Sequence, residues 1–232
     1  MNNAINKSIF YVSNLGSNKV SIIHGENFDI IDEIKVGPRP FEMVVDNKNN
    51  VFIATDRNDK VTIIDSRTRN IKSLYIPNNG HVKVDSISQK IYVSNTEEIY
   101  VYSLKDEKIV DKISGFIAVD GIELNSDGSK LFTLDIFQNE IKVYDTLSLR
   151  VIKTYKDIGE SPNYIYFGNE ERYLYVSNKG INKFGLSGSL VLIDLYTDSI
   201  SFISLPKGSI INSIDVKGDL LYIVNSGLNK IE

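Results

Sequence analysis

The stretch Phe10-Tyr11-Val12-Ser13-Asn14 decides the fold, because close copies of it recur along the whole chain. The copies are Phe52-Ile53-Ala54-Thr55-Asp56, Ile91-Tyr92-Val93-Ser94-Asn95, Leu131-Phe132-Thr133-Leu134-Asp135, Leu174-Tyr175-Val176-Ser177-Asn178 and Leu221-Tyr222-Ile223-Val224-Asn225. The residues that end successive copies are separated by 42, 39, 40, 43 and 47 positions. A period near 40 is typical of repeat architectures, in which each repeat is one supersecondary unit.

Each copy has a fixed place among other strand-like segments. An apolar-alternating segment ends ten residues before each of the last five copies ends, at Asp46, Asp85, Asn125, Gly168 and Asp215. A third segment, such as Val61-Thr62-Ile63-Ile64-Asp65, and a more variable apolar stretch, such as 71–76, follow each of the first five copies. The segments are rich in Val, Ile, Tyr and Phe, and none keeps a period of 3.6 residues. The sequence therefore predicts an all-β protein with four short strands in each repeat.

Four-stranded repeats of this length predict a β-propeller, in which small sheets, the blades, pack around a central channel. We predict one repeat domain over 1–232 whose first strands end near residues 46, 85, 125, 168 and 215. The chain holds five repeats plus the first strands of a sixth, because it reaches residues 229–232 where another third strand should begin. The alternatives are a chain truncated in its sixth repeat, with an incomplete ring, and a five-bladed ring with one strand left over. Self-association is expected if the ring is open, because open rings expose strand edges and apolar faces.

The repeated residues resemble the YVTN-repeat β-propellers of bacteria and archaea. Tyr-Val-Ser-Asn occurs at 11–14, 92–95 and 175–178, and the stretches before two first strands are Val36-Gly37-Pro38-Arg39-Pro40 and Ile158-Gly159-Glu160-Ser161-Pro162. The resemblance covers almost the whole chain and implies the propeller fold, but the family has no shared catalytic motif. Two of the corresponding stretches, 115–117 and 208–210, depart from this pattern because they lack the following proline.

Composition excludes several kinds of site and partner. With 26 basic and 30 acidic residues, the net charge of −4 gives no electrostatic reason to expect a nucleic acid or an anionic membrane. The chain has no cysteine and two histidines, which excludes disulfides, thiolate metal sites and a three-histidine metal site. No stretch approaches the roughly 18 apolar residues of a membrane span, and the polar start at 1–7 does not look like a signal peptide. We therefore predict no membrane partner and a cytoplasmic location, with the cell surface or export as the alternative if the start codon is misassigned.

Residue alternation divides the first strands into two faces. One set is predicted to be core: Met43/Val45, Val82/Val84, Ile122/Leu124, Ile165/Phe167 and Asn212/Ile214. The other set shares a face near the channel: Glu42/Val44, His81/Lys83, Gly121/Glu123, Tyr164/Tyr166 and Ile211/Ser213. Its polar members, Glu42, His81, Lys83, Glu123, Tyr164 and Tyr166, predict a ligand-binding lining. The alternative is that these groups only pair with one another and with trapped water.

Two further residues complete the candidate ligand-binding set. Arg39 lies just before a first strand, on the same predicted face as His81. Lys183 lies in 179–188, the one long connection between a second and a third strand. Long loops on rigid scaffolds often carry binding residues, although a tolerated surface insertion is the alternative.

His81 is the candidate catalytic residue, because a histidine on this face is suited to act as a general base. No nucleophile or metal partner for it can be identified, so the sequence predicts no catalytic set, no metal site and no cofactor. The repeated Asn and Asp residues are predicted to start turns. We predict a non-enzymatic binding or scaffold propeller that presents loops from one face to a protein, peptide or small ligand. The alternative is a lactonase-like hydrolase or lyase with its site at the channel mouth.

Overall fold

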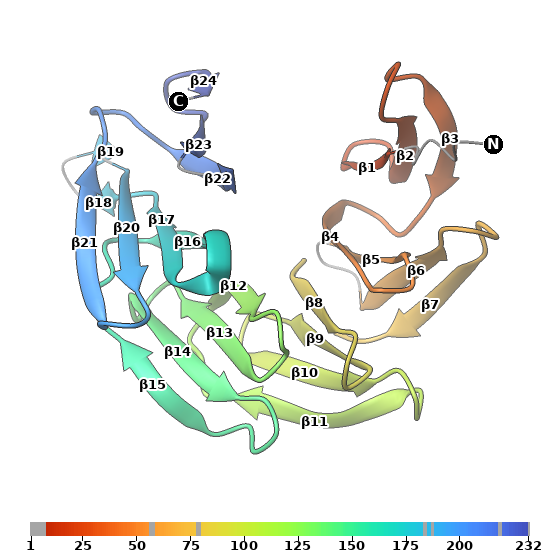
Figure 1. Cartoon of the computed structure of the whole chain (residues 1–232), viewed down its shortest axis with the longest axis horizontal. Coiled ribbons are helices and arrows are strands. Elements are labelled where there is room, and N and C mark those ends of the chain that lie inside the picture. The colour runs from red at the N-terminus through yellow and green to blue at the C-terminus, as the bar shows by residue number, and fades with distance from the viewer. Residues whose placement is uncertain are drawn as a thin grey trace, which may run out of the picture. The chain divides into compact units, whose positions relative to one another are not determined.

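The computed structural model describes residues 8–55, 59–77, 80–182, 185–186, 188–217 and 220–231. These residues form six blades of antiparallel strands, which confirms the predicted all-β propeller fold (Figure 1). Within the described ranges, four blades have four strands, while the first and last have three. The strands of each blade follow one another across the sheet in chain order, which is the topology expected for short hairpin connections.

The strand bounds agree with the sequence-based repeats. Blade 1 contains β1 (Ile9–Asn14), β2 (Lys19–His24) and β3 (Ile30–Lys35), and blade 2 contains β4 (Pro40–Val45), β5 (Asn50–Thr55), β6 (Lys60–Asp65) and β7 (Ile71–Tyr75). Blade 3 contains β8 (Val82–Asp85), β9 (Lys90–Ser94), β10 (Glu98–Ser103) and β11 (Lys108–Ser114), and blade 4 contains β12 (Val119–Leu124), β13 (Lys130–Asp135), β14 (Glu140–Asp145) and β15 (Val151–Tyr155). Blade 5 contains β16 (Pro162–Phe167), β17 (Tyr173–Asn178), β20 (Ser189–Asp194) and β21 (Ser199–Ser204), and blade 6 contains β22 (Ile211–Lys217), β23 (Leu220–Asn225) and β24 (Lys230–Ile231). A 3₁₀ turn, η1 (Asn169–Glu171), joins β16 to β17, and a small ribbon, β18 (Ile181–Asn182) and β19 (Gly185–Leu186), lies between β17 and β20.

The chain divides into two compact units, which are described separately. Unit 1 comprises Met1–Val84, Ile91–Asn95 and Tyr100–Asp111, and unit 2 comprises Asp85–Lys90, Thr96–Ile99 and Lys112–Glu232. Unit 1 therefore contains blades 1 and 2, and unit 2 contains blades 4 to 6, with the strands of blade 3 shared between them.

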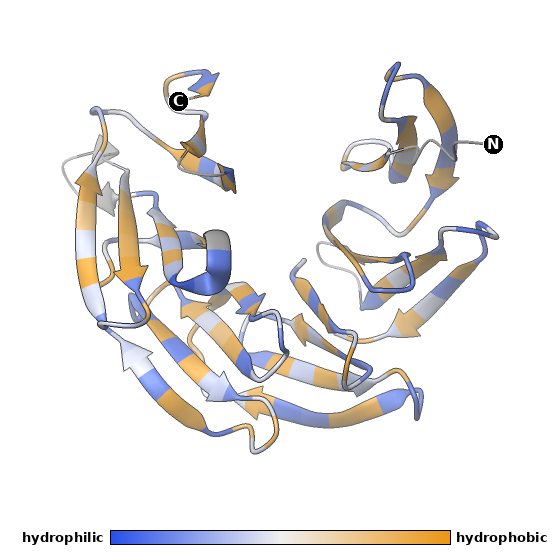
Figure 2. Cartoon of the chain, viewed as in Figure 1, coloured by the Kyte–Doolittle hydropathy of each residue, from blue (hydrophilic) through white to orange (hydrophobic). Residues whose placement is uncertain are grey.

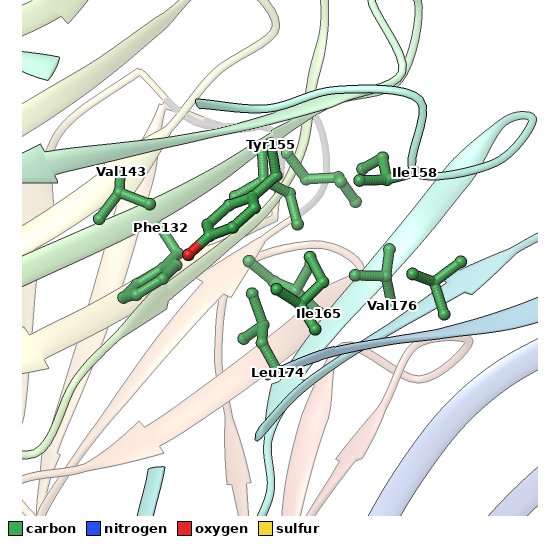
Figure 3. Packing of buried hydrophobic residues seen from close by; sticks show 11 residues of the cluster. Phe132, Val143, Tyr155, Ile158, Ile165, Leu174 and Val176 are labelled. Carbon is green, nitrogen blue, oxygen red and sulfur yellow. The ribbon is translucent and has the colours of Figure 1, made fainter. Parts of the chain in front are cut away.

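The core of each unit lies between consecutive blades. In unit 2, Phe132 and Val143 of blade 4 pack with Leu174 and Val176 of blade 5 (Figure 3). Apolar and polar residues alternate along most strands, as the hydropathy colouring shows (Figure 2). A blade buries both faces against its neighbours, which is why these strands are rich in β-branched and aromatic residues.

The predicted turn role of the aspartates is confirmed. Asp46 Oδ1 accepts hydrogen bonds from the backbone N–H groups of Lys48 and Asn50, at 2.9 and 2.7 Å. Asp145 does the same in another turn, where its Oδ1 accepts from the N–H of Ser148 at 2.7 Å. These carboxylates satisfy local backbone donors, as Asx turns do.

Four of the loops before the first strands fall into two classes, which differ in whether the loop contains the proline. In the proline-containing loops, Arg39 and Ser161 have φ values of 50° and 51°. Their N–H groups donate to a side-chain oxygen in the preceding blade, Asn18 Oδ1 at 2.9 Å for Arg39 and Asn139 Oδ1 at 3.3 Å for Ser161. The two loops without proline bond within their own blade: Ile117 N–H donates to Asp135 Oδ2 at 2.8 Å and Ile210 N–H to Asn225 Oδ1 at 3.1 Å.

This difference between the loops explains an unpaired atom in blade 5. Asn178 Oδ1 is buried without a hydrogen-bond partner among the described residues. Asn178 ends β17 as Asn225 ends β23, but its blade has a proline-containing loop. The loop N–H of Ser161 bonds to Asn139 in the preceding blade, so it does not donate to Asn178.

One assignment of a residue to a position within the repeat was wrong. In the second copy, Thr55 and not Asp56 takes the place of Asn14, because Ala54 pairs with Val61 as Ser13 pairs with Val20. Asp56 itself lies outside the described residues.

The predicted faces of the first strands also need correction in two blades. Ile211 is fully buried and belongs to the core, while Asn212, predicted to be core, is exposed and accepts a hydrogen bond from Ser226 at 2.7 Å. The register shift between Ile211 and Ser213 inserts one residue into β22 and so changes the alternation. In blade 2, Val45 is 52% exposed and Val44 packs against the core instead.

Candidate functional site

Three of the predicted lining residues form one polar cluster in unit 1. Glu42 lies in β4, Lys83 in β8, and His81 directly precedes β8. Lys83 Nζ lies 2.7 Å from Glu42 Oε1, and His81 Nδ1 lies 3.4 Å from Glu42 Oε2. The N–H of Val82 also donates to Glu42 Oε2 at 3.0 Å. We call Glu42, His81 and Lys83 the blade 2–3 cluster, since their contacts join the first strands of these two blades.

Local backbone geometry places Glu42 toward this cluster. The pairing of β4 with β5 shifts register between Pro40 and Met43, so one additional residue is accommodated in β4 there. Such bulges redirect side chains at the ends of strands. The bulge therefore lies at the part of β4 that carries Glu42.

The blade 2–3 cluster is largely withdrawn from solvent. The side chains of Glu42, His81 and Lys83 are 18%, 10% and 15% exposed. Burial by itself would raise the pKa of Glu42, but the Lys83 ammonium, the His81 side chain and the hydrogen bonds to both outweigh it and lower that pKa to about 2. Glu42 is thus a carboxylate at neutral pH and a poor proton acceptor.

The ring of His81 also contacts the aromatic ring of Phe41. The two rings meet edge to face, with centroids 5.5 Å apart. Gly80, which precedes His81, has a φ of 112°, and a Cβ at that position would lie 2.8 Å from Phe41 Cδ1. A glycine is therefore needed there to bring His81 under the Phe41 ring.

A second group of predicted lining residues lies in unit 2. The Tyr166 hydroxyl donates to Asp215 Oδ1 at 2.9 Å, which joins β16 of blade 5 to β22 of blade 6. Burial, the bond to Asp215 and the nearby Tyr164 and Glu123 raise the pKa of Tyr166 to about 12. Glu123 also accepts a hydrogen bond from the N–H of Leu124 at 3.1 Å. The prediction that these three residues share a face is consistent with this electrostatic coupling, and we call the group with Asp215 the tyrosine–carboxylate cluster.

The remaining two candidates are Arg39 and Lys183. Arg39 is exposed in the loop before β4, and its main chain is fixed through its bond to Asn18. Lys183 lies outside the described residues. Their predicted binding roles remain predictions.

The long connection after β17 contains a feature that the sequence analysis missed. It forms the ribbon β18–β19 and is attached to neighbouring loops at both ends. The N–H groups of Lys179 and Gly180 donate to the carbonyls of Ser161 and Glu160, each at 3.0 Å, and the N–H of Gly188 donates to the carbonyl of Ser209 at 3.1 Å. A Cβ on residue 188 would lie 2.6 Å from that Ser209 oxygen, so glycine permits the approach. These are main-chain bonds, and the glycines at 180 and 188 are the only sequence signal for them.

Among the described residues, no group of three or more His, Asp or Glu side chains is placed to hold a metal ion. In the part of the chain that the structure describes, no helix has the length and apolar character to cross a membrane.

Comparison with curated proteins gives one partial relative. Antigen Lp49 of Leptospira interrogans serogroup Icterohaemorrhagiae serovar copenhageni is 30% identical over an alignment of 134 residues, and the match covers 54% of this chain and 29% of that protein. The chain therefore spans less than a third of the length of this curated relative. No family model matches the chain.

Comparison with solved structures supports the fold. Hydrazine synthase of Kuenenia stuttgartiensis matches with a TM-score of 0.86 and 15% identity, over 97% of this chain and 72% of that one. A catalytically inactive variant of virginiamycin B lyase from Staphylococcus aureus, solved with quinupristin, matches with a TM-score of 0.78 and 15% identity, over 97% of this chain and 76% of that one. A functionally unknown protein of Desulfotomaculum acetoxidans matches with a TM-score of 0.76 and 14% identity, over 94% of this chain and 72% of that one. At these identities the likeness establishes a shared fold.

Proposed function

We propose that the chain is a non-enzymatic binding or scaffold propeller of the YVTN-repeat type, which presents loops from one edge of its blades to a protein, peptide or small ligand. The observation that carries this proposal is the anchored ribbon β18–β19. In blades 1 and 4, residues 15–18 and 136–139 make the corresponding connection as short turns. Blade 5 instead holds a longer segment in place through main-chain bonds to the loops before β16 and β22.

An attached ribbon is better suited to binding than a flexible insertion of the same length. Its ends are fixed by three backbone bonds, so less conformational freedom is lost when a partner binds it. The loops to which it is attached are those that lead into the first strands of blades 5 and 6. Loops carried on a rigid scaffold in this way are common binding surfaces.

Replacing the ribbon tests the proposal. Residues 179–188 are exchanged for the turn of blade 4, Ile136-Phe137-Gln138-Asn139, and the wild-type and exchanged chains are labelled and applied to peptide and glycan arrays. We expect the exchanged chain to no longer bind the array ligands that wild type binds. Its far-UV circular dichroism spectrum should match that of wild type, which would show that it still folds. A chain with Leu147→Ser, which changes a 90% exposed turn residue in blade 4, is the matched control. Identical binding by all three chains would show that the ribbon is not the binding surface.

The enzymatic alternative has one specific observation in its favour. His81 and Glu42 form a histidine–carboxylate pair that is largely buried, and such pairs hold an imidazole in one orientation. The fold shared with a lyase is consistent with this alternative, although it supports the architecture alone. A hydrolase or lyase would turn over a lactone or ester from a substrate panel and would lose that turnover in His81→Ala. Retained turnover in that variant would exclude His81 as the base.

The location of the protein is also a proposal. We propose the cytoplasm, as the sequence analysis predicts, while the name of the partial relative, an antigen, favours the alternative of a surface position. Protease treatment of intact cells distinguishes the two, because only a surface-exposed chain is degraded before lysis.

A further inference from the structure

The outermost strand of blade 5, β21, has one edge that pairs with no other strand among the described residues. The strand order of this blade is β16-β17-β20-β21, and all four strands lie in unit 2 (Figure 1). An antiparallel pair uses the main-chain groups of alternate residues, so the remaining N–H and C=O groups of β21 point away from β20. Such an edge can pair with a further strand, and most proteins protect it.

The sequence of β21 lacks the usual protection. Its six residues, Ser199-Ile200-Ser201-Phe202-Ile203-Ser204, include no charge and no proline. The outermost strands of the other four-stranded blades carry lysines, which are Lys72 in β7, Lys108 and Lys112 in β11, and Lys153 in β15. The pairing of β21 with β20 runs over six consecutive positions without a bulge, whereas the pairing of β15 with β14 shifts register. Charges and bulges are two of the devices that keep strand edges from pairing.

The charge that precedes β21 is held toward another blade. Asp198 lies 2.7 Å from Lys153 Nζ, and it accepts a hydrogen bond from the Tyr155 hydroxyl at 2.8 Å. Both partners belong to β15 of blade 4. The Asp198 carboxylate therefore compensates a lysine of blade 4, and the edge of β21 stays uncharged.

β21 also exposes apolar side chains. Phe202 is 58% exposed and Ile203 is 38% exposed. Ile200 packs against the core that blades 4 and 5 share, and Phe202 lies on the same face as Ile200 because side chains two residues apart share a face. A strand added to this edge would therefore find an aromatic and a β-branched side chain next to each other on one face.

We propose that β21 pairs with β21 of a second copy of this chain, antiparallel, about a two-fold axis that passes through Ser201. Residues opposite each other in an antiparallel ladder lie on the same face of the sheet. With Ser201 opposite its own copy, Ile200 of each chain lies opposite Phe202 of the other, so the favourable aromatic–β-branched pair forms twice. No like charges meet, because the strand has none. The strand is thus complementary to itself, and that self-complementarity identifies the partner as a second copy.

The proposed contact joins the two sheets into one continuous sheet across the axis. The same edge is used on both copies, so the contact is isologous and closes at the dimer. It lies on the outermost strand of blade 5 and not on the ribbon between β17 and β20, so it does not depend on the proposed binding function.

Charge reversal at Ser201 tests the contact and its register together. Ser201 is exposed in the single chain, and Ser201→Lys would set two lysines opposite each other, as Ser201→Glu would set two glutamates. We expect wild type to form a dimer in sedimentation velocity, and each variant alone to dimerise about fivefold more weakly or worse. An equimolar mixture places lysine opposite glutamate and is expected to restore the dimer. Ser73→Lys, the same change at an exposed serine in the middle of β7, is the matched control and is expected to dimerise like wild type.

Three outcomes overturn the proposal. A wild type that stays monomeric at every concentration shows that no second copy covers this edge. Variants that both dimerise as strongly as wild type show that the copies meet elsewhere. A mixture that stays monomeric, although each variant keeps the circular dichroism of wild type, contradicts the register.

Disulfide formation locates the axis independently. The chain has no cysteine, so S201C and S204C each introduce a single thiol. Paired Cα atoms of an antiparallel ladder lie about 4.5–5.5 Å apart, which is within the range that a disulfide spans. We expect oxidation to link S201C chains and to leave S204C chains unlinked, because residue 204 lies three positions from the axis on each copy. Equal linking of the two variants would contradict an axis through Ser201.

Discussion

Replacing Glu42 by glutamine is expected to destabilise the fold in a way that depends on pH. The carboxylate has a pKa lowered from 4.5 to about 2, and it pairs with Lys83 at 2.7 Å and His81 at 3.4 Å. At about 1.4 kcal/mol per pKa unit, this difference corresponds to about 3 kcal/mol of stability at pH 7. Glutamine keeps an oxygen that accepts from Val82 but removes the charge that compensates Lys83.

The sign of the pH dependence follows from the direction of the pKa change. A carboxyl group with a lowered pKa in the folded chain stabilises it at pH values above the unfolded pKa of about 4.5. This stabilisation is lost as the pH falls through the folded value of about 2. With these two values, the contribution of Glu42 falls to about 1.4 kcal/mol at pH 3.

Urea unfolding measures this difference directly. The chain has 13 tyrosines and no tryptophan, so tyrosine fluorescence and far-UV circular dichroism are the two probes. The free energy of unfolding of wild type minus that of Glu42→Gln is measured at pH 7, 5 and 3. Glu33→Gln is the matched control, because Glu33 pairs with Lys19 at 2.8 Å but on the exposed surface, where a much smaller change is expected. A difference for Glu42→Gln that is no larger than that of the control, or that is the same at pH 7 and pH 3, would refute the reasoning.

Two further substitutions test the loop before β16 and the tyrosine–carboxylate cluster. Gly159→Ala is expected to lower the free energy of unfolding by about 2 kcal/mol or more, because φ is 104° there and the new Cβ would lie 2.4 Å from Asn178 Nδ2. Gly16→Ala, where nothing lies within 4 Å of the added atom, is the control, and equal losses would contradict the clash. Ultraviolet titration of wild type minus Tyr166→Phe should show one phenol ionising near pH 12, since burial and the bond to Asp215 raise its pKa to about 12. The stability that this phenol contributes is present below pH 10 and lost as the pH rises toward 12, so a phenol that ionises near pH 10 would contradict the contact.

The fold could be predicted because the repeat imposes the same pattern several times. One copy of Tyr-Val-Ser-Asn would be compatible with many β proteins, but the alignment of copies fixes strand order and approximate bounds. The errors fall where backbone pairing departs from that pattern. The shift between Ile211 and Ser213 reverses which side chains face the core, and alternation alone does not reveal an inserted residue.

Side-chain alternation along the strands is visible in the sequence, whereas the contacts that the side chains and the main chain make are not. Alternation along the first strands assigned Glu42, His81 and Lys83 to one predicted face, and in the structure His81 and Lys83 each contact Glu42. The partner of Tyr166, Asp215, was interpreted as the end of a strand, because a contact between blades depends on side-chain reach. The attachments of the β18–β19 ribbon are bonds between main-chain atoms, which any residue type can make.

The geometry of the blade 2–3 cluster favours a structural role for it over a catalytic one. Glu42 uses both carboxylate oxygens, one toward Lys83 and the other toward His81 and the N–H of Val82. These contacts join the first strands of two blades that would otherwise be tied at this end mainly by apolar packing. A substrate that recruited Lys83 or His81 would have to break a contact with a largely buried carboxylate whose pKa is about 2 and would leave that charge uncompensated. Binding through the loops and the attached ribbon would break no such contact, and for that reason we propose the loops and the ribbon, and not the blade 2–3 cluster, as the functional surface.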